Sequence, residues 1–422
     1  MTFSYRTVLG LVLGLGALAG CKKELDTYYA TPATGGFASI ALPGVPALAT
    51  KYAPGETIPL TLGYNASDSP SSITVFQASR LDSSQAGSYP LSGGTFNQTL
   101  DLTTLTVPYV VPTTFPVGTL VRVDVTLNFA DGGQRLRRFT YTVANSPTLA
   151  NGTPTLTYRN GLAAAQQTEG DVIGYAVALN AGGISTVPTG ATSPPANLFK
   201  SVDSLVYYAR AGSAGALQRQ GVVRSPTAGV ANNRTLDVRI PSGSAAAGGV
   251  QFVFRAFAQS TSATLTSALL PVAGAGVPLA TLRRGTVSFG GGSSADSLAF
   301  NLSTGLNEPA ANASTGKDLQ VSGLSSTTAG ALTLSAPNTT RYYKLSSTQL
   351  AAVPYATATA NQVGLLLYQN TPTADLGTPA AGDVYAVRLR GSAGTPLLLR
   401  IVGTRASTSG GIGRVRFEYR AL

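Results

Sequence analysis

The sequence predicts an all-β protein of several domains, and three observations support this prediction. First, the 422 residues are 43% hydrophobic but only 11% charged, and they include 48 glycines. This composition suits many short strands joined by turns, whereas helical proteins use more Glu, Lys and Leu. Second, apolar and polar residues alternate along many segments, which is the period of a half-buried strand. Third, the chain contains an internal repeat.

The first twenty residues have the organisation of a secretory signal peptide. Arg6 supplies the positive n-region, and residues 8–19 form an apolar h-region. A stretch of this length is too short to cross a bilayer, because a spanning helix needs about 20 residues. We therefore expect residues 1–20 to be removed from the mature protein.

The single cysteine of the chain, Cys21, directly follows this segment. The sequence Leu18, Ala19, Gly20 and Cys21 resembles the bacterial lipobox. The resemblance implies cleavage before Cys21 and acylation of its thiol. The mature protein would then be a lipoprotein that carries fatty-acid chains such as palmitate. With no second cysteine, a disulfide within the chain is impossible. The alternative is a chance cysteine after a short apolar helix.

The residues that follow indicate where the lipid anchor is placed. Residues 22–26 (KKELD) resemble the surface-export signal of Bacteroidota lipoproteins, and residues 21–36 are predicted to be the lipidated cysteine and its linker. A solvated charged tether would give the same pattern. The expected location is the outer membrane, lipid-anchored and exposed on the cell surface, with the periplasmic face as the alternative.

The internal repeat indicates two related modules. Residues 55–66 (GETIPLTLGYNA) align with residues 170–181 (GDVIGYAVALNA), and residues 97–102 (NQTLDL) mirror residues 233–238 (NRTLDV). Ile58, Leu60, Leu62 and Tyr64 are predicted to share one strand face, as are the apolar residues at positions 121, 123, 125 and 127. Residues 130–133 (ADGG) have the chemistry of a hairpin turn.

Six or seven short strands in each copy describe an antiparallel β-sandwich. Residues 37–146 and 147–278 are therefore predicted to be two tandem Ig-like β-sandwiches, and they resemble the modules common in Bacteroidota surface lipoproteins. The cysteines and tryptophan of antibody domains are absent, since the chain has one Cys and no Trp. The resemblance therefore concerns the architecture alone.

The third region, residues 279–422, does not continue the repeat and is predicted to be a further β-rich domain. Residues 347–354 suit a short helical turn, and residues 382–391, 396–407 and 413–421 suit a closing antiparallel meander. This pattern resembles the C-terminal half of β-rich lipoproteins related to haem-scavenging ones. That family binds haem through histidine, and this chain has no histidine. We therefore expect the fold without the activity, and no cofactor.

The residue types present argue against an enzyme. The absence of histidine removes the commonest general base and metal ligand, and the expected acylation of Cys21 removes the only thiol. No catalytic residue and no metal ligand is therefore predicted. A glycosidase with two carboxylates across a cleft is one alternative. Another is sugar binding through tyrosine rings, of which the chain has 18.

A set of arginines near the C-terminus is the candidate binding site. The net charge is +11, and 23 of the 29 basic residues are arginine. Alternation along strands is expected to place five of them on one basic face: Arg388, Arg390, Arg414, Arg416 and Arg420. Arginine suits bidentate contacts with sulfate, phosphate or carboxylate. The predicted partner is an anionic polysaccharide or an acidic envelope protein, and a solvated face that blunts the sheet edge is the alternative.

Nucleic acid is not an expected partner, because no nucleic-acid-binding motif accompanies the charge. The sequence as a whole predicts a non-catalytic, lipid-anchored protein of the cell envelope, with an adhesion, structural or ligand-binding role. The alternative function is an accessory glycan-binding lipoprotein of an outer-membrane nutrient uptake system.

Overall fold

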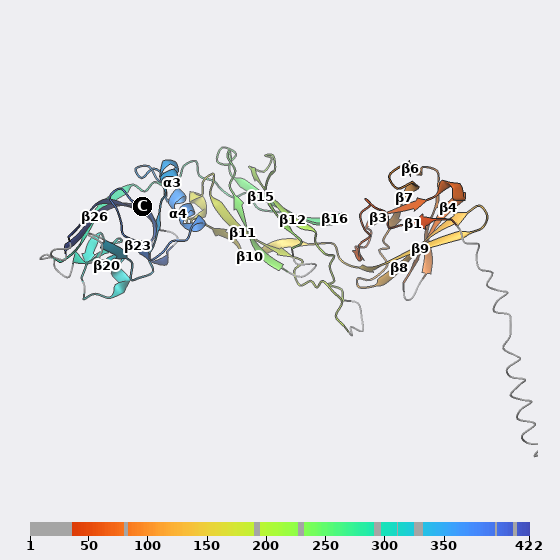
Figure 1. The fold of residues 1–422 in the computed structure, drawn as a ribbon, viewed down its shortest axis with the longest axis horizontal. Helices are drawn as coiled ribbons and strands as arrows, with labels where there is room; N and C mark the ends of the chain where they lie inside the picture. Colours follow the sequence, from red (N-terminus) through yellow and green to blue (C-terminus); the bar gives the residue numbers. More distant parts are fainter. Residues whose placement is uncertain are drawn as a thin grey trace, which may run out of the picture. The chain divides into compact units, whose positions relative to one another are not determined.

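The computed structural model confirms the all-β fold (Figure 1). It describes residues 36–79, 83–189, 195–226, 232–290, 297–309, 311–324, 332–392, 395–407 and 412–422. The signal peptide, the lipobox and Cys21 lie outside these residues, so the predictions about them stay predictions. Within the described ranges, no helix has both the length and the apolar character needed to cross a bilayer.

The chain folds into two compact units. The first comprises Met1–Ser146 and Ile184–Lys200, and the second comprises Pro147–Gly183 and Ser201–Leu422. The predicted domain boundaries did not anticipate that Ile184–Lys200 leaves the second sandwich to join the first unit. The chain consequently passes between the two units three times, at residues 146–147, 183–184 and 200–201.

The first unit is a two-sheet sandwich. One sheet has the order β1-β3-β7-β6, and the other has the order β2-β9-β8-β4-β5. The strands are β1 (Ala38–Ser39), β2 (Lys51–Tyr52), β3 (Thr57–Tyr64), β4 (Pro70–Ala78), β5 (Ser83–Pro90), β6 (Thr95–Asn97), β7 (Leu102–Val110), β8 (Leu120–Phe129) and β9 (Gln134–Val143). The predicted inward faces of β3 and β8 are both buried in the core between the sheets, which confirms their period-two patterns.

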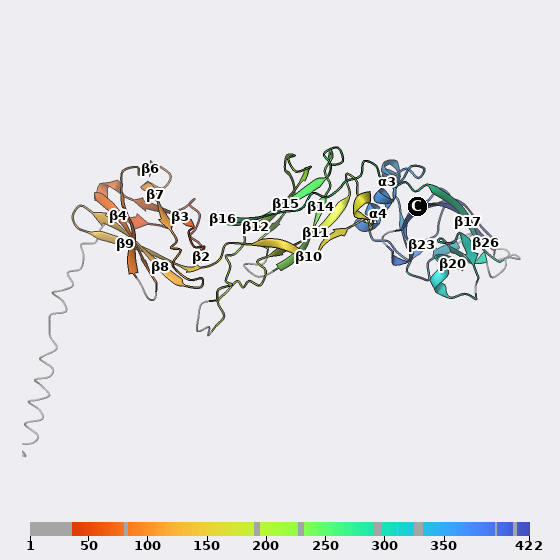
Figure 2. The same ribbon diagram turned by 180° about the vertical axis from the view of Figure 1, so that it is seen from behind.

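The second sandwich opens the second unit. Its sheets have the orders β10-β11-β14 and β13-β12-β15-β16 (Figure 2). The strands are β10 (Leu149–Tyr158), β11 (Val172–Leu179), β12 (Ser204–Ala211), β13 (Gln218–Arg224), β14 (Asn232–Arg239), β15 (Val250–Ala258) and β16 (Thr261–Thr266). Apolar residues from both sheets form one buried core, in which Tyr175 packs against Phe252 and Phe254.

The third region is also a two-sheet sandwich. Its sheets have the orders β17-β26-β25-β24-β22 and β19-β18-β20-β21-β23. The strands are β17 (Thr281–Phe289), β18 (Ala299–Asn301), β19 (Leu306–Glu308), β20 (Leu319–Leu324), β21 (Leu332–Ser335), β22 (Arg341–Lys344), β23 (Asp375–Gly377), β24 (Val384–Arg388), β25 (Pro396–Ser407) and β26 (Ile412–Ala421). Neighbouring strands β24, β25 and β26 confirm the predicted closing meander.

Two α-helices, α3 (Ser347–Ala352) and α4 (Ala360–Gln369), lie side by side in both views (Figures 1 and 2). The short helix α3 confirms the predicted helical turn, whereas α4 was not predicted. Its apolar residues, including Val363 and Leu367, share a buried cluster with Ala386 of β24 and Leu398 of β25. The helix therefore covers the β24–β25 end of the outer face of the first sheet and leaves the β17–β26 end open.

The repeated segments fold in the same way at their start. Gly55 and Gly170 both have positive φ, at 77° and 88°, which suits glycine because it lacks a Cβ. The acids that follow them, Glu56 and Asp171, each accept a hydrogen bond of 2.7 Å from the backbone N–H three residues earlier. The shared glycine–acid pair is therefore a turn motif that starts β3 and β11.

Each of these acids also binds a side chain from a later segment of the chain. Lys200 donates to both oxygens of Glu56, at 2.5 and 2.7 Å, and Asn361 of α4 donates to Asp171 at 2.7 Å. The second aligned pair is not structurally equivalent. Residues 97–102 lie mainly in the turn between β6 and β7, whereas residues 233–238 lie within β14. The alignment of those six residues was wrong.

Candidate anionic-ligand site

The outer face of β26 carries the charged residues that alternation predicted. Val415, Phe417 and Tyr419 are buried in the core between the two sheets. The residues between and beside them point to the opposite face, and these are Arg414, Arg416, Glu418 and Arg420. The sequence therefore located this strand and its two faces correctly.

A β-bulge in β25 adds two arginines to the same face. Arg400 lies opposite Glu418 and Arg405 lies opposite Arg414, although residues five apart in a regular strand point to opposite faces. The register shifts between Ile401 and Gly403, so that Val402 is the extra residue. A bulge of this kind reverses the alternation beyond it. Arg400 and Arg405 consequently share the outer face.

The neighbouring strand β17 contributes Arg284, which lies opposite Glu418. Glu418 thus lies between two arginines, with its Oε2 3.8 Å from Nε of Arg284 and its Oε1 2.5 Å from Nη2 of Arg400. We call the outward set Arg284, Arg400, Arg405, Arg414, Arg416 and Arg420 the arginine face. In the described strands β17, β25 and β26, Glu418 is the one acid among these six arginines.

Three members of the arginine face have no hydrogen-bond or ion-pair partner among the described residues: Arg405, Arg414 and Arg416. Arg405 lies directly opposite Arg414, and like charges in this position destabilise a sheet. Arg416 lies opposite Gly403, and a Cβ placed on that glycine would be 3.5 Å from Nη2 of Arg416. The Arg416 guanidinium therefore extends over β25 at Gly403, which is two residues from Arg405.

The end of the arginine face that includes Arg400 and Arg420 packs against the segment that contains Tyr355. Arg400 and Arg420 both stack on the ring of Tyr355, with their Cζ atoms 4.5 and 5.5 Å from its centroid. Burial, together with the Glu418 carboxylate, raises the pKa of Tyr355, so its phenol stays protonated. Arg388 donates to the Leu367 carbonyl of α4 at 3.0 Å. These contacts hold the helical segment on the sheet.

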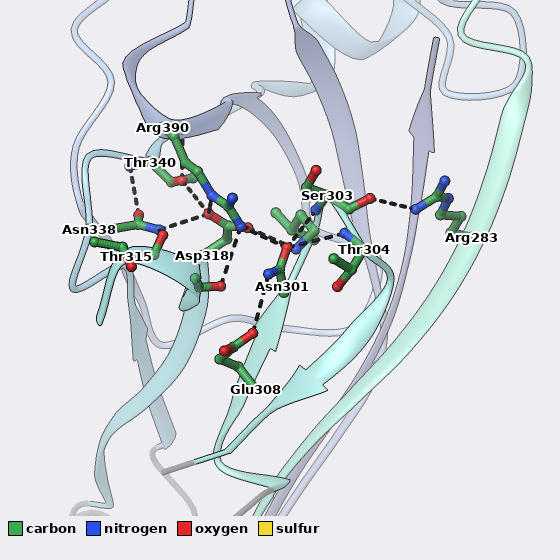
Figure 3. Close-up of polar contacts among 12 residues, drawn as sticks. Arg283, Asn301, Ser303, Thr304, Glu308, Thr315, Asp318, Asn338, Thr340 and Arg390 are labelled. Atoms are coloured by element: carbon green, nitrogen blue, oxygen red, sulfur yellow. Dashed lines mark hydrogen bonds and ion pairs between the residues drawn. The ribbon is translucent and has the colours of Figure 1, made fainter. Parts of the chain in front are cut away.

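Arg390 does not share this face, which differs from the prediction. β24 ends at Arg388, and Arg390 lies in the following turn with a φ of 49°. Its guanidinium binds both carboxylate oxygens of Asp318, at 2.8 and 2.9 Å, and the side-chain oxygen of Asn301 at 2.7 Å (Figure 3). The positive φ of Arg390 turns its side chain toward the second sheet. The alternation of residues in the sequence gives no sign of this change of backbone.

Asp318 is the centre of this second cluster and is fully buried. Besides Arg390, it accepts hydrogen bonds from Thr340, Asn338 and the backbone N–H of Leu302 (Figure 3). A buried carboxylate with this many donors is satisfied and has no need of an external partner. The cluster ties the loops at one end of the sandwich together, and Arg390 serves the fold there.

A groove of about 650 Å³ borders the arginine face, and Arg284 and Arg416 are the members of the face in its lining. Its lining runs from Val402 on β25, over Arg416 and Glu418 on β26, to Arg284 on β17 and Leu306 on β19. Glu418 is the one acid in this lining, whereas glycoside hydrolysis needs two facing carboxylates. The described lining thus holds two arginines and one acid, so its net charge is positive.

Two tyrosines of the doubled pairs 207–208 and 342–343 are engaged in contacts within the protein. Tyr342 is buried and donates to the Asp318 carbonyl at 2.5 Å, and the Arg255 guanidinium lies over the Tyr208 ring at 5.6 Å. Neither ring is an open platform for a sugar. Among the described residues, no group of three or more His, Cys, Asp and Glu side chains is placed to hold a metal ion.

Sequence reasoning missed Arg284, Arg400 and Arg405. A signal for Arg284 was present, because residues 281–289 alternate as a strand and the pairing with β26 would have placed it. Arg400 could have been placed by pairing residues 396–407 with residues 413–421 within the predicted meander. Arg405 was harder to place, because Gly403 inside the strand is a marker of a bulge but does not show which residue is the extra one.

Comparison with known proteins gives no close relative. No protein-family model and no curated protein sequence matches the chain. Among solved structures, a DUF4466 family protein from Parabacteroides merdae has 14% identity and a TM-score of 0.24, covering 65% of this chain and 99% of its own. A bacterial ice-binding adhesin has 15% identity and a TM-score of 0.21, covering 87% and 90%.

A fragment of the ICAM-5 ectodomain, D1–D4, has 11% identity and a TM-score of 0.19, covering 92% of this chain and 76% of its own. TM-scores and identities this low establish no shared function. The functional argument therefore rests on the site.

Proposed function

We propose that this chain is a non-catalytic, lipid-anchored protein of the bacterial cell envelope whose C-terminal sandwich binds an anionic polysaccharide. The binding surface is the part of the arginine face that lies away from Glu418, formed by Arg405, Arg414 and Arg416. The observation that carries the proposal is the corner formed by Arg405, Arg414 and Arg416, where like charges face each other without an acid among the described residues. An anionic ligand would remove the repulsion that the folded sheet contains.

The envelope location is supported by the first 26 residues. A signal peptide, a lipobox ending at Cys21 and the charged residues 22–26 together match a secreted and acylated chain. Arginine suits such a location, because polysaccharides outside the cell carry sulfate, phosphate and carboxylate groups that its planar fork can bind. The two N-terminal sandwiches would then serve as the connection between the lipid and the binding domain.

Binding of residues 27–422 to dextran sulfate and to neutral dextran tests the proposal. This chain lacks only the signal peptide and the lipidated tether. We expect dextran sulfate to bind, the affinity to fall as salt rises from about 50 to about 500 mM, and neutral dextran not to bind. The variant Arg414→Ala/Arg416→Ala should lose at least tenfold in affinity, about 1.4 kcal/mol.

The matched control is Arg219→Ala/Arg224→Ala. These two exposed arginines lie on β13 of the second sandwich, so the control removes the same charge at a distant strand. We expect its affinity to stay within twofold of the wild type. Absence of dextran sulfate binding, or an equal loss in both variants, would contradict the proposal and leave the arginine face as a solvated surface.

A further inference from the structure

Glu418 shows how this sheet binds an oxyanion. Its carboxylate bridges two arginines from the strands on either side, and each of its two oxygens faces one guanidinium, Arg284 on β17 and Arg400 on β25. The side chain of Glu418 is only 9% exposed, so the bridge is partly shielded from water. An internal anion therefore balances one of the two positive charges in this row of the arginine face.

Further along this face, arginines lie on neighbouring strands without an acid between them among the described residues, and the β17 neighbour of Arg414 is Ser288. Arg414 lies on the same face of β26 as Glu418, and its neighbour on β25 is Arg405. Neighbouring strands are about 4.8 Å apart, and residues two apart along a strand are separated by about 6.8 Å. Arg416 lies between the two rows and extends over Gly403, which is two residues from Arg405. Arg405, Arg414 and Arg416 consequently occupy neighbouring positions on one face of β25 and β26.

The number of arginines indicates the kind of anion. In the Glu418 bridge each carboxylate oxygen faces one arginine. A sulfate ester presents three terminal oxygens, so each of three arginines can face an oxygen of its own. The strands of this face contain arginine and no lysine. Because a guanidinium is more weakly hydrated than an ammonium group, it pairs readily with a weakly hydrated sulfate ester.

We propose that Arg405, Arg414 and Arg416 form a subsite for one sulfate ester group of a sulfated polysaccharide. This inference rests on the proposed function and makes it specific. Each arginine donates to one terminal oxygen of the sulfate, while Arg284 and Arg400 stay paired with Glu418. The chain then distinguishes sulfated polymers from uronic acid polymers by the number of oxygens presented to the three arginines.

Four single variants of residues 27–422 test the subsite: Arg405→Ala, Arg414→Ala, Arg416→Ala and, as matched control, Arg284→Ala. Each removes one charge from the same sheet face. Arg284 is 78% exposed, so its removal does not disturb the core. Titration with dextran sulfate should show a five- to tenfold loss for each of the first three variants and less than a twofold loss for the control. Thermal unfolding verifies that all four variants fold.

The ligand panel compares dextran sulfate, dextran phosphate and polygalacturonate at one ionic strength. We expect dextran sulfate to bind at least tenfold more tightly than polygalacturonate. Equal losses in all four variants would refute the subsite and leave the proposed function standing, because the face would then bind as diffuse charge. Tighter binding of dextran phosphate or polygalacturonate would refute the sulfate assignment. Failure of the wild type to bind any of the three would overturn both.

Discussion

The ion pair between Lys200 and Glu56 offers the sharpest test of how the first unit is held together. The two side chains are 2% and 1% exposed, and Lys200 Nζ lies 2.5 Å from Oε1 of Glu56. The same ammonium lies 5.5 Å from the centroid of the Tyr52 ring. The pair joins the segment Ile184–Lys200 to the turn that starts β3.

The substitution Lys200→Met removes the cation and keeps a side chain of similar length. Glu56 is then left as an uncompensated buried charge, and breaking a buried pair in this way costs about 3–5 kcal/mol. In the double variant Glu56→Gln/Lys200→Met the charge is absent on both sides. The introduced glutamine still has an oxygen for the N–H of Ala53, which in the wild type donates to Glu56 at 2.7 Å. We expect the double variant to recover most of the loss.

Hydrogen exchange of residues 27–422 measures the effect locally, which suits a chain of several domains because global unfolding would not be two-state. The amide of Lys200 donates to the Asn145 carbonyl and that of Phe199 donates to the Ile184 carbonyl, both at 3.0 Å. A loss of about 3 kcal/mol increases their exchange by about 100-fold. Exchange in α4 is the control and should not change. Wild-type exchange rates at residues 199 and 200 in Lys200→Met would refute the reasoning.

Three further predictions concern single side chains. Glu418→Gln frees its two arginine partners, so affinity for dextran sulfate should rise about threefold by calorimetry, and an unchanged or lower affinity would count against the electrostatic account. Hydrogen bonds from Asn312 and Asn301 lower the pKa of Glu308 below 4.5, so its stabilisation is present above pH 4.5 and is lost as the pH falls through the lowered value. The Tm difference between wild type and Glu308→Gln should accordingly be larger at about pH 7 than at about pH 3, and equal differences would contradict this. Cys21→Ser should abolish the incorporation of labelled palmitate into the chain expressed from residue 1, whereas unchanged labelling would exclude acylation of this thiol.

The sequence predicted those parts of the fold that depend on alternation alone. Ile58, Leu60 and Leu62 on β3 are buried as their period indicates, and the same holds for the inward residues of β8 and β26. A strand buried on one face leaves a clear pattern because a slip of one residue would expose its whole apolar set.

Features that depend on a local change of backbone were not predictable in this way. The bulge at Val402 brings Arg405 onto the arginine face, and the positive φ of Arg390 takes that residue away from it. Both changes reverse the direction of a side chain without changing the residue pattern. The full set of residues on the arginine face could therefore be assigned only from the pairing register of β25 against β26.

The helix α4 was missed although its start was marked. Thr359 accepts from the N–H of Gln362, and the Gln362 side chain accepts in return from the N–H of Thr359, which is a capping box. The segment has 10 residues and lies between β-rich stretches. It covers fewer than three helical turns, which is too short for a clear helical period in the sequence. Helix formation here is favoured by packing on β24 and β25.

A crystal structure of residues 27–422 with a defined sulfated oligosaccharide tests the central claim most directly. The account predicts one sulfate group with its terminal oxygens within hydrogen-bond distance of Arg405, Arg414 and Arg416, while Glu418 keeps both of its arginine partners. A sulfate bound to Arg284 and Arg400 in place of Glu418, or sulfates bound only on other domains, would contradict it.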